Sequence, residues 1–274
     1  MSSGKGPATH DEAFWHDYLT NPNGMQASGR RVFSRIPSHP RCRLCAMPFA
    51  GPGGRMLRLA GKRPSDHNPN VCNSCQTFMT RHHGGAEVNG SLLFADIRGS
   101  TELAETMSPA EYHALLDRFY TVASDVVVGH NGIVDKFVGD EVVAVFPPML
   151  SNGRHAASAV EAARALLIAT GHAEGAGPWL RVGAAVHTGR VWFGAVGEGS
   201  YVEMTVLGDP VNTTARFAAI AGAGEILVSE AAASEAGLDP ALELRALDLK
   251  GKEHPTQVVT LRVGPEGAPA SSSG

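Results

Sequence analysis

Two short apolar runs joined by a Gly-Asp dipeptide constrain the fold of this chain more than any other feature. Residues 133–138 read IVDKFV, residues 141–146 read EVVAVF, and only a glycine and Asp140 separate them. Runs of this length and composition predict strands, and a two-residue connection with glycine predicts a hairpin turn. A third apolar run, SLLFAD at 91–96, also ends in an aspartate, Asp96. We therefore expect a sheet with one carboxylate at a strand end and another at a hairpin tip.

From Val88 onward, apolar strands alternate with amphipathic helices. Ser108 and Glu111 have the spacing of a capping box, and Pro109 lies at the first helical position, so a helix is expected from 109 to about 128. Further helices are expected at 12–19, 154–169 and 210–221, and further strands at 182–186, 191–196, 202–207, 226–229 and 258–263. The first two of these strands are expected to form a pair. Adjacent hairpin strands mixed with crossover helices predict an α+β fold, a mixed-sheet sandwich.

The composition changes near residue 85. All four cysteines precede it, in a segment rich in proline and glycine with little periodicity beyond the short helix at 12–19. Such a segment is expected to lack a core of its own. The predicted organisation is an N-terminal helix and linker at 1–40, a four-cysteine module at 41–85, a main domain at 86–264 and a disordered tail at 265–274.

Charge and hydropathy narrow the function classes. The formal net charge of -4 gives no basic field for wrapping nucleic acid. The N-terminal residues are polar and acidic, unlike a signal peptide, and no apolar run approaches the roughly 20 residues that span a bilayer. We expect a cytoplasmic protein without a membrane segment.

The four cysteines form two C-x2-C pairs, Cys42 with Cys45 and Cys72 with Cys75. Two such pairs bring four thiolates into a tetrahedral set, which predicts a metal site in a zinc-ribbon-like module. Disulfides fit poorly with a cytoplasmic chain. Zinc is the first choice, and an iron-sulfur cluster is the alternative.

The two aspartates have a structural and a functional interpretation. A single strand-end aspartate is usually a turn former or helix cap. However, the residues after Asp96, 97–101, lead from a buried strand into a helix start, where free N–H groups favour phosphate oxygens. Asp140 lies in an equally apolar frame. Together they predict a two-metal site for phosphoryl chemistry.

Four motifs in order, FADIRGST, DKFVGDEVVAVF, TVLGDPVNTTAR and LKGKEHP, resemble the catalytic domain of class III nucleotidyl cyclases. The resemblance covers roughly residues 86–264 and implies a ferredoxin-like core. It also implies that Asp96 and Asp140 bind two Mg²⁺ or Mn²⁺ ions, with a backbone carbonyl from Ile97. By the same resemblance, Asn212 orients the ribose, and Arg216 stabilises charge at the α-phosphate in the transition state.

The substrate-binding residues expected from the resemblance and from the helix start are Lys136, Thr205, Lys250, Gly99, Ser100 and Thr101. Lys136 only donates hydrogen bonds, and the Thr205 hydroxyl can accept one from the adenine amino group, so the pair resembles that of adenylyl cyclases. Lys250 resembles a lysine that binds terminal phosphates. The chain departs from the family pattern at Thr205, where many adenylyl cyclases carry aspartate, and at Ser100, where phenylalanine is frequent.

The resemblance implies a head-to-tail homodimer in which each site takes metal ligands from one chain, and base-selecting and transition-state residues from the other. The expected function is adenylate cyclase: conversion of ATP to 3′,5′-cyclic AMP and pyrophosphate for intracellular signalling. The alternatives are a guanylate cyclase and a catalytically silent nucleotide-binding regulator. A further alternative is a nucleic-acid-binding protein led by the cysteine module, with its basic residues Arg30, Arg31, Arg35, Arg41, Arg43, Arg55, Arg58, Lys62 and Arg63. Nucleic acid is not the expected partner.

Overall fold

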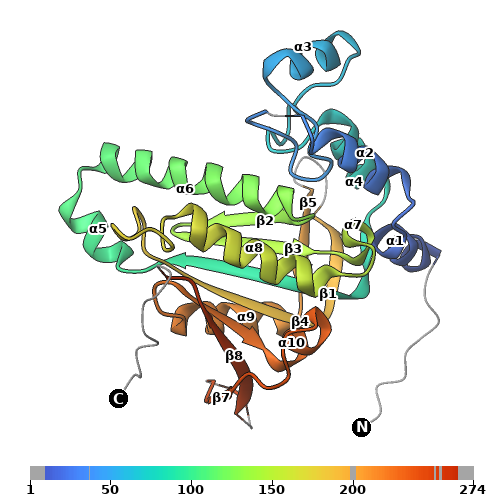
Figure 1. Ribbon diagram of the computed structural model, residues 1–274. Coiled ribbons are helices and arrows are strands. Elements are labelled where there is room, and N and C mark those ends of the chain that lie inside the picture. Colours follow the sequence, from blue (N-terminus) through green and yellow to red (C-terminus); the bar gives the residue numbers. More distant parts are fainter. Residues whose placement is uncertain (1–9, 37, 198–201, 250, 253–254, 265–274) are drawn as a thin grey trace.

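A computed structural model describes residues 10–36, 38–197, 202–249, 251–252 and 255–264. Its eight-stranded sheet has the order β2-β3-β1-β4-β6-β8-β7, and β5 pairs with β4 off this path (Figure 1). The strands are β1 (Gly84–Ile97), β2 (Ile133–Val138), β3 (Glu141–Phe146), β4 (Val182–Val196), β5 (Glu203–Leu207), β6 (Glu225–Ser229), β7 (Leu244–Leu247) and β8 (Thr256–Arg262). Pairing is antiparallel except between β4 and β6, which makes the sheet mixed.

The helices cover both faces of the sheet. They are α1 (His10–Thr20), α2 (Met25–Phe33), α3 (Gly51–Leu59), α4 (Asn73–Arg81), α5 (Ser100–Thr106), α6 (Pro109–Gly129), α7 (Pro148–Ser151), α8 (His155–Ala169), α9 (Asp209–Ile220) and α10 (Glu230–Ala236). Apolar residues of α6, α8 and α10 share one core cluster with the sheet, whereas α9 and the N-terminal segment share the other. The predicted α+β sandwich is confirmed. Within the described residues, no helix combines the length and apolarity needed to span a membrane.

The expected strand pair at 182–186 and 191–196 is wrong, because both runs belong to one continuous strand, β4. The register runs from Ile97 opposite Val182 to Gly84 opposite Ala195, so β1 also begins earlier than the predicted residue 91. The residues between the two predicted runs, 187–190, remain extended because β1 pairs with every one of them. This long antiparallel pair forms the centre of the sheet.

The predicted hairpin at 133–138 and 141–146 is confirmed, with Gly139 at a φ of 61° in the turn. Positive φ carries little strain for glycine, which allows the tight connection. The capping box of α6 is also confirmed: the Ser108 side chain accepts from the Glu111 backbone N–H, and the Glu111 side chain accepts from the Ser108 backbone N–H. These local signals place the hairpin and α6 correctly.

The N-terminal segment contains more helix than its sequence predicted. Helices α2, α3 and α4, each of nine residues, were missed because such short stretches give weak periodicity. Buried side chains such as Trp15, Phe49 and Met79 join the core cluster of the sheet face that includes Phe193. In Figure 1 the N-terminal helices gather at one side of the sheet, and α3 projects away from it.

Candidate functional site

The end of β1 lies beside the turn between β2 and β3, and this brings the predicted metal ligands together. Asp96 is opposite Glu141 in the β1/β3 ladder, and the backbone N–H of Ile97 donates to the backbone carbonyl of Asp140 at 3.3 Å. Two segments more than forty residues apart in sequence thus converge at the same end of strands β1 and β3. We call the carboxylates of Asp96, Asp140 and Glu141 at this end the carboxylate edge.

The charges at this edge are unbalanced. Arg98 donates to Asp96 Oδ2, but Asp96 Oδ1 is buried and has no hydrogen-bond partner among the described residues. Burial, together with the charge of Asp140, raises the pKa of Glu141 to about 7, although Arg98 opposes both effects. The carboxylates of Asp96, Asp140 and Glu141 therefore share a single guanidinium, that of Arg98. An unpartnered buried carboxylate oxygen in an anionic cluster fits a hard divalent cation such as Mg²⁺ or Mn²⁺.

Sequence reasoning missed Arg98 and Glu141 as members of this group. Both are adjacent in sequence to a predicted ligand: Arg98 follows Ile97, and Glu141 follows Asp140. The available signal was a charged residue at the end of an apolar strand, the same signal that identified the aspartates.

The segment after β1 turns into a helix as predicted. Gly99 adopts a left-handed conformation with a φ of 77°, and α5 begins at Ser100 without a side-chain cap. Gly99 and Thr101 are exposed, and Ser100 is half-buried. This helix start directly follows Arg98 in the sequence.

Asn212 and Arg216 lie four residues apart on α9, which begins with Asp209 and Pro210. Asn212 is exposed and Arg216 is half-buried. A Cβ added at Gly251 would lie 3.7 Å from an Arg216 guanidinium nitrogen, so this side chain is beside the turn after β7. Lys250, predicted to bind phosphate, lies outside the described residues. Lys252, its neighbour, donates to Asp209 Oδ2 at 2.5 Å.

Lys136 and Thr205 meet although 69 residues separate them in sequence: Lys136 Nζ donates to Thr205 Oγ1 at 3.1 Å. Lys136 comes from β2 and Thr205 from β5. Asp135, which sequence reasoning missed, lies against both side chains, with its Oδ2 3.3 Å from each of the two atoms. The available signal for Asp135 was a carboxylate next to Lys136, inside a strand whose other residues are apolar.

Among the described residues, no hydrogen bond or ion pair joins Lys136 or Thr205 to Asp96 or Asp140. The chain therefore presents the carboxylate edge and the lysine-threonine pair as two separate groups. Arg98 links the carboxylate edge to the end of α9, because it donates to the Ala219 carbonyl at 3.1 Å.

The four cysteines form a compact buried cluster. Their sulfur atoms all lie within 4.8 Å of one another, and Cys45 Sγ is 3.7 Å from Cys72 Sγ. The backbone N–H of Cys72 donates to Cys42 Sγ at 3.2 Å, and the backbone N–H of Cys75 donates to Cys72 Sγ at 3.4 Å. Tetrahedral zinc with a Zn–S distance of about 2.3 Å places sulfur atoms roughly 3.8 Å apart, so the cluster fits a single tetrahedral ion.

The cysteine cluster is joined to β2 by two arginines. The buried guanidinium of Arg30 donates to the carbonyls of Arg43 at 2.8 Å and Leu44 at 2.5 Å, between two cysteines, and to the carbonyl of Gly132 before β2. Burial lowers the pKa of Arg30 to about 10, and the neighbouring cysteines oppose this shift. Arg43 donates to the Asp135 carbonyl at 3.2 Å, and its guanidinium lies 5.7 Å from the centre of the Phe137 ring.

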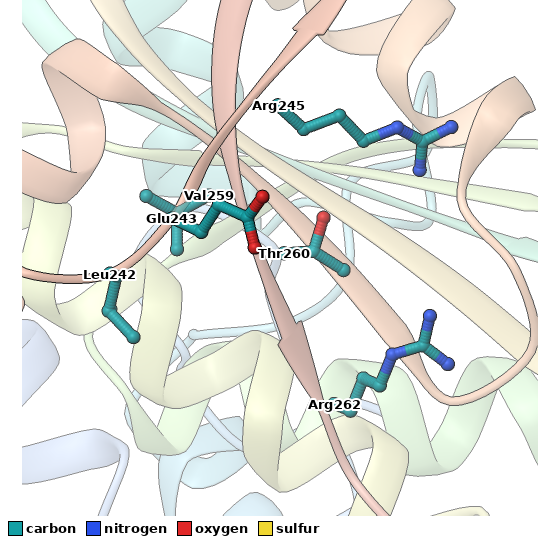
Figure 2. Close-up of a pocket in the computed structure, with 6 residues that line it drawn as sticks. All are labelled: Leu242, Glu243, Arg245, Val259, Thr260 and Arg262. Carbon is teal, nitrogen blue, oxygen red and sulfur yellow. The ribbon is translucent and has the colours of Figure 1, made fainter. Parts of the chain in front are cut away.

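A separate open groove of about 630 Å³ lies along β7 and β8. Figure 2 shows the guanidinium groups of Arg245 and Arg262 pointing to the same side of this groove. Arg262 pairs with Glu225 at 2.5 Å, so one of the two charges is already neutralised. The lining contains none of the predicted site residues.

Comparison with known proteins agrees with this geometry. Residues 86–260 match the family described as the adenylate and guanylate cyclase catalytic domain. The structure of the guanylyl cyclase Cya2 superposes with a TM-score of 0.60 at 26% identity, over 69% of this chain and 98% of that one. The adenylyl cyclase CyaB from P. aeruginosa superposes with a TM-score of 0.56 at 27% identity, over 64% of this chain and 93% of that one.

Curated relatives are similar over part of their length. An uncharacterized protein of Mycobacterium bovis is 41% identical over 140 residues, which is 50% of this chain and 24% of the relative. Another, from Mycobacterium tuberculosis, is 31% identical over 190 residues, or 68% of this chain and 34% of the relative. The chain thus spans about a quarter to a third of the relatives that it matches.

Proposed function

The chain belongs to the class III adenylyl and guanylyl cyclase family, and from this premise we propose that it is an adenylyl cyclase, which converts ATP to 3′,5′-cyclic AMP and pyrophosphate. The family does not decide the base, because similar solved structures include both a guanylyl cyclase and an adenylyl cyclase. The proposal of ATP must rest on this chain's own residues.

The contact between Lys136 Nζ and Thr205 Oγ1 at 3.1 Å carries the proposal. Lysine offers only donors, and adenine presents the N1 acceptor on its Watson–Crick edge. The threonine oxygen can accept from the neighbouring adenine amino group. Guanine presents a carbonyl oxygen and an N1–H donor instead, which reverses both requirements.

We assign the carboxylate edge to the metal ions and the triphosphate. Asp96 and Asp140, with the Ile97 carbonyl, would hold two Mg²⁺ or Mn²⁺ ions. Bound there, the ions would lower the pKa of the ribose 3′-hydroxyl and neutralise charge on the triphosphate. Gly99, Ser100 and Thr101 would offer backbone N–H groups to phosphate oxygens.

In the reaction, the ribose 3′ oxygen bonds to the α-phosphorus, the bond from that phosphorus to the bridging oxygen breaks, and pyrophosphate leaves. The hydroxyl proton is released to solvent. Arg216 carries a permanent charge that would stabilise the additional negative charge at the α-phosphate, and Asn212 would orient the ribose by hydrogen bonding. Lys250 would contact the terminal phosphates.

We propose that a homodimer completes the site. The resemblance to class III cyclases supports this, because in that family metal ligands and base-selecting residues of one site come from different chains, and this chain holds both sets. A head-to-tail pairing would bring the carboxylates of one chain to the base-selecting pair of its partner.

We propose zinc for the cysteine cluster. The 3.7 Å sulfur separation and the mutual proximity of all four sulfurs support one ion, since an iron-sulfur cluster would place several atoms between the thiolates and hold them further apart. Four free thiols and an ATP substrate also favour the cytoplasm as the location of the protein.

The nucleic-acid alternative is weakened by how the arginines are used. Arg30 and Arg43 donate to carbonyls at the module's contact with β2, Arg41 to carbonyls including that of Ile36, and Arg58 to that of Phe49. Guanidinium groups engaged within the chain are less available to phosphates.

The direct test incubates purified protein with ATP or GTP and Mg²⁺ or Mn²⁺, and identifies the products by mass spectrometry. We expect cyclic AMP and pyrophosphate in equal amounts from ATP. Cyclic GMP as the main product would support the guanylyl alternative, and binding without any turnover would support the silent regulator.

A further inference from the structure

The strand that carries Lys136 contains a β-bulge. In the β2/β3 ladder, Val134 lies opposite Ala144, but Lys136 lies opposite the adjacent residue Val143, so Asp135 is the extra residue. A bulge interrupts the alternation of side chains and can redirect a side chain next to a functional site. Here the bulge allows two consecutive side chains, Asp135 and Lys136, to reach the same Thr205 hydroxyl.

The three side chains form a closed triangle of polar contacts. Lys136 Nζ lies 3.1 Å from Thr205 Oγ1, and Asp135 Oδ2 lies 3.3 Å from both of these atoms. The Asp135 side chain is 1% exposed, whereas the Lys136 side chain is 40% exposed. Thr205 is buried as well, at 5% exposed, so the Lys136 side chain is the partly exposed member of the triangle.

Hydrogen-bond chemistry fixes the direction of each contact when Asp135 is ionised. The ammonium of Lys136 only donates, so the Thr205 oxygen accepts from it. A carboxylate only accepts, so the Thr205 hydroxyl must direct its proton at Asp135. The threonine then has one lone pair left and no proton to offer a ligand.

Resting on the proposed function, we propose that Asp135 is a positioning residue for base selection. Its carboxylate holds the Thr205 hydroxyl as an acceptor and the Lys136 ammonium as a donor. This pattern matches the amino group and N1 of adenine and mismatches the carbonyl and N1–H of guanine. Without the carboxylate, the Thr205 hydroxyl can rotate and donate to the guanine carbonyl.

Stability does not explain a carboxylate at this position. Burial raises the pKa of Asp135 to about 6, although Lys136 and Thr205 both act to lower it. The ionised form is therefore less favourable here than in water. A group that opposes folding in its charged state is more readily explained by its effect on Thr205 and Lys136.

The test compares wild type with Asp135→Asn, which removes the charge and adds an amide donor at nearly constant volume. Asp117→Asn is the matched control, because it removes the same charge at an exposed position on α6. Each protein receives equal concentrations of ATP and GTP, and the ratio of cyclic AMP to cyclic GMP gives the ratio of kcat/KM values. The affinity ratio for the two nucleotides is also measured by equilibrium binding, which requires no turnover.

We expect Asp135→Asn to lower the ATP-to-GTP preference by about tenfold or more, and the control to retain it. A purely structural role would reduce both nucleotides equally, so an unchanged ratio in folded Asp135→Asn protein overturns the proposal while leaving the adenylyl assignment intact. A wild-type preference for GTP overturns the adenylyl assignment first and this proposal with it.

Discussion

Arg43, which lies between the first two cysteines, donates a hydrogen bond of 3.2 Å to the backbone carbonyl of Asp135. This contact joins the cysteine cluster to the bulge next to Lys136, the residue that we propose selects the base. Arg30 adds a second connection through the carbonyl of Gly132. The cysteine module therefore packs directly against β2, and its integrity is expected to affect the domain that it contacts.

Arg30→Ala is expected to lower the free energy of unfolding by about 3 kcal/mol or more. Three carbonyls would lose their charged donor: those of Leu44 and Gly132 at buried hydrogen bonds, and that of Arg43 at a partly buried one. Arg35→Ala is the control, because Arg35 is an exposed arginine of the same segment. Urea denaturation measures both variants, and equal losses would contradict the specific role given to Arg30.

The cysteine cluster is expected to bind one zinc ion per chain. Elemental analysis of purified protein should find zinc, and Cys72→Ser should lower both the zinc content and the Tm, since metal binding and folding are coupled in such modules. Ser74→Ala, between two cysteines but with no thiolate, should retain the metal. Iron together with acid-labile sulfide in place of zinc would contradict the assignment.

The buried carboxylate of Asp135 predicts a pH dependence of stability. Its pKa rises from 3.8 to about 6 on folding, so between these values the folded chain binds more protons than the unfolded chain. Stability from this group is therefore lost as pH rises through that window. The charged groups around it are Lys136, Glu203 and Arg43.

Asp135→Asn removes this titration. Relative to wild type, its free energy of unfolding should increase as pH rises from about 4 to 6 and stay higher above pH 6, by at most roughly 3 kcal/mol. Denaturation at pH 4.5 and pH 8 measures the difference. A variant that is less stable than wild type at pH 8 would refute this account of the buried charge.

Separate inactivation of the two halves of the site tests the homodimer. Asp96→Ala and Arg216→Ala should each be inactive, but a 1:1 mixture should recover about a quarter of wild-type activity, because half of the dimers are mixed and each has one intact site. Asp96→Ala mixed with Asp140→Ala is the control. This mixture should stay inactive, because both substitutions remove metal ligands and neither site of the mixed dimer keeps a complete set. An inactive first mixture in which heterodimers are detected would refute the shared site.

Sequence signals correctly identified the parts of the fold that a few neighbouring residues determine, such as a turn or a helix cap. Gly139 with Asp140 marked the hairpin, and Ser108 with Glu111 marked the start of α6. Residues 187–190 misled because their glycine and polar residues resemble a turn, whereas pairing with β1 keeps them extended. That pairing is a tertiary effect, which single-chain periodicity does not contain.

Residues of the candidate site could be named from the sequence where they belong to motifs that occur in a known order. They could not be named where their role depends on which strands lie next to each other in the fold. Asp96, Asp140, Lys136 and Thr205 were named from sequence, and the contact between the last two is 3.1 Å. Asp135 was missed because its importance arises from a bulge in β2 and from the approach of β5. No spacing rule in the sequence predicts either of these.

The most direct test of the central claim is competition between equal concentrations of ATP and GTP in one reaction of the wild-type protein with Mg²⁺ or Mn²⁺. The product ratio then reports base selection independently of total activity. The Lys136–Thr205 contact predicts that cyclic AMP exceeds cyclic GMP by about tenfold or more. Cyclic GMP formed in equal or greater amount would contradict the adenylyl assignment.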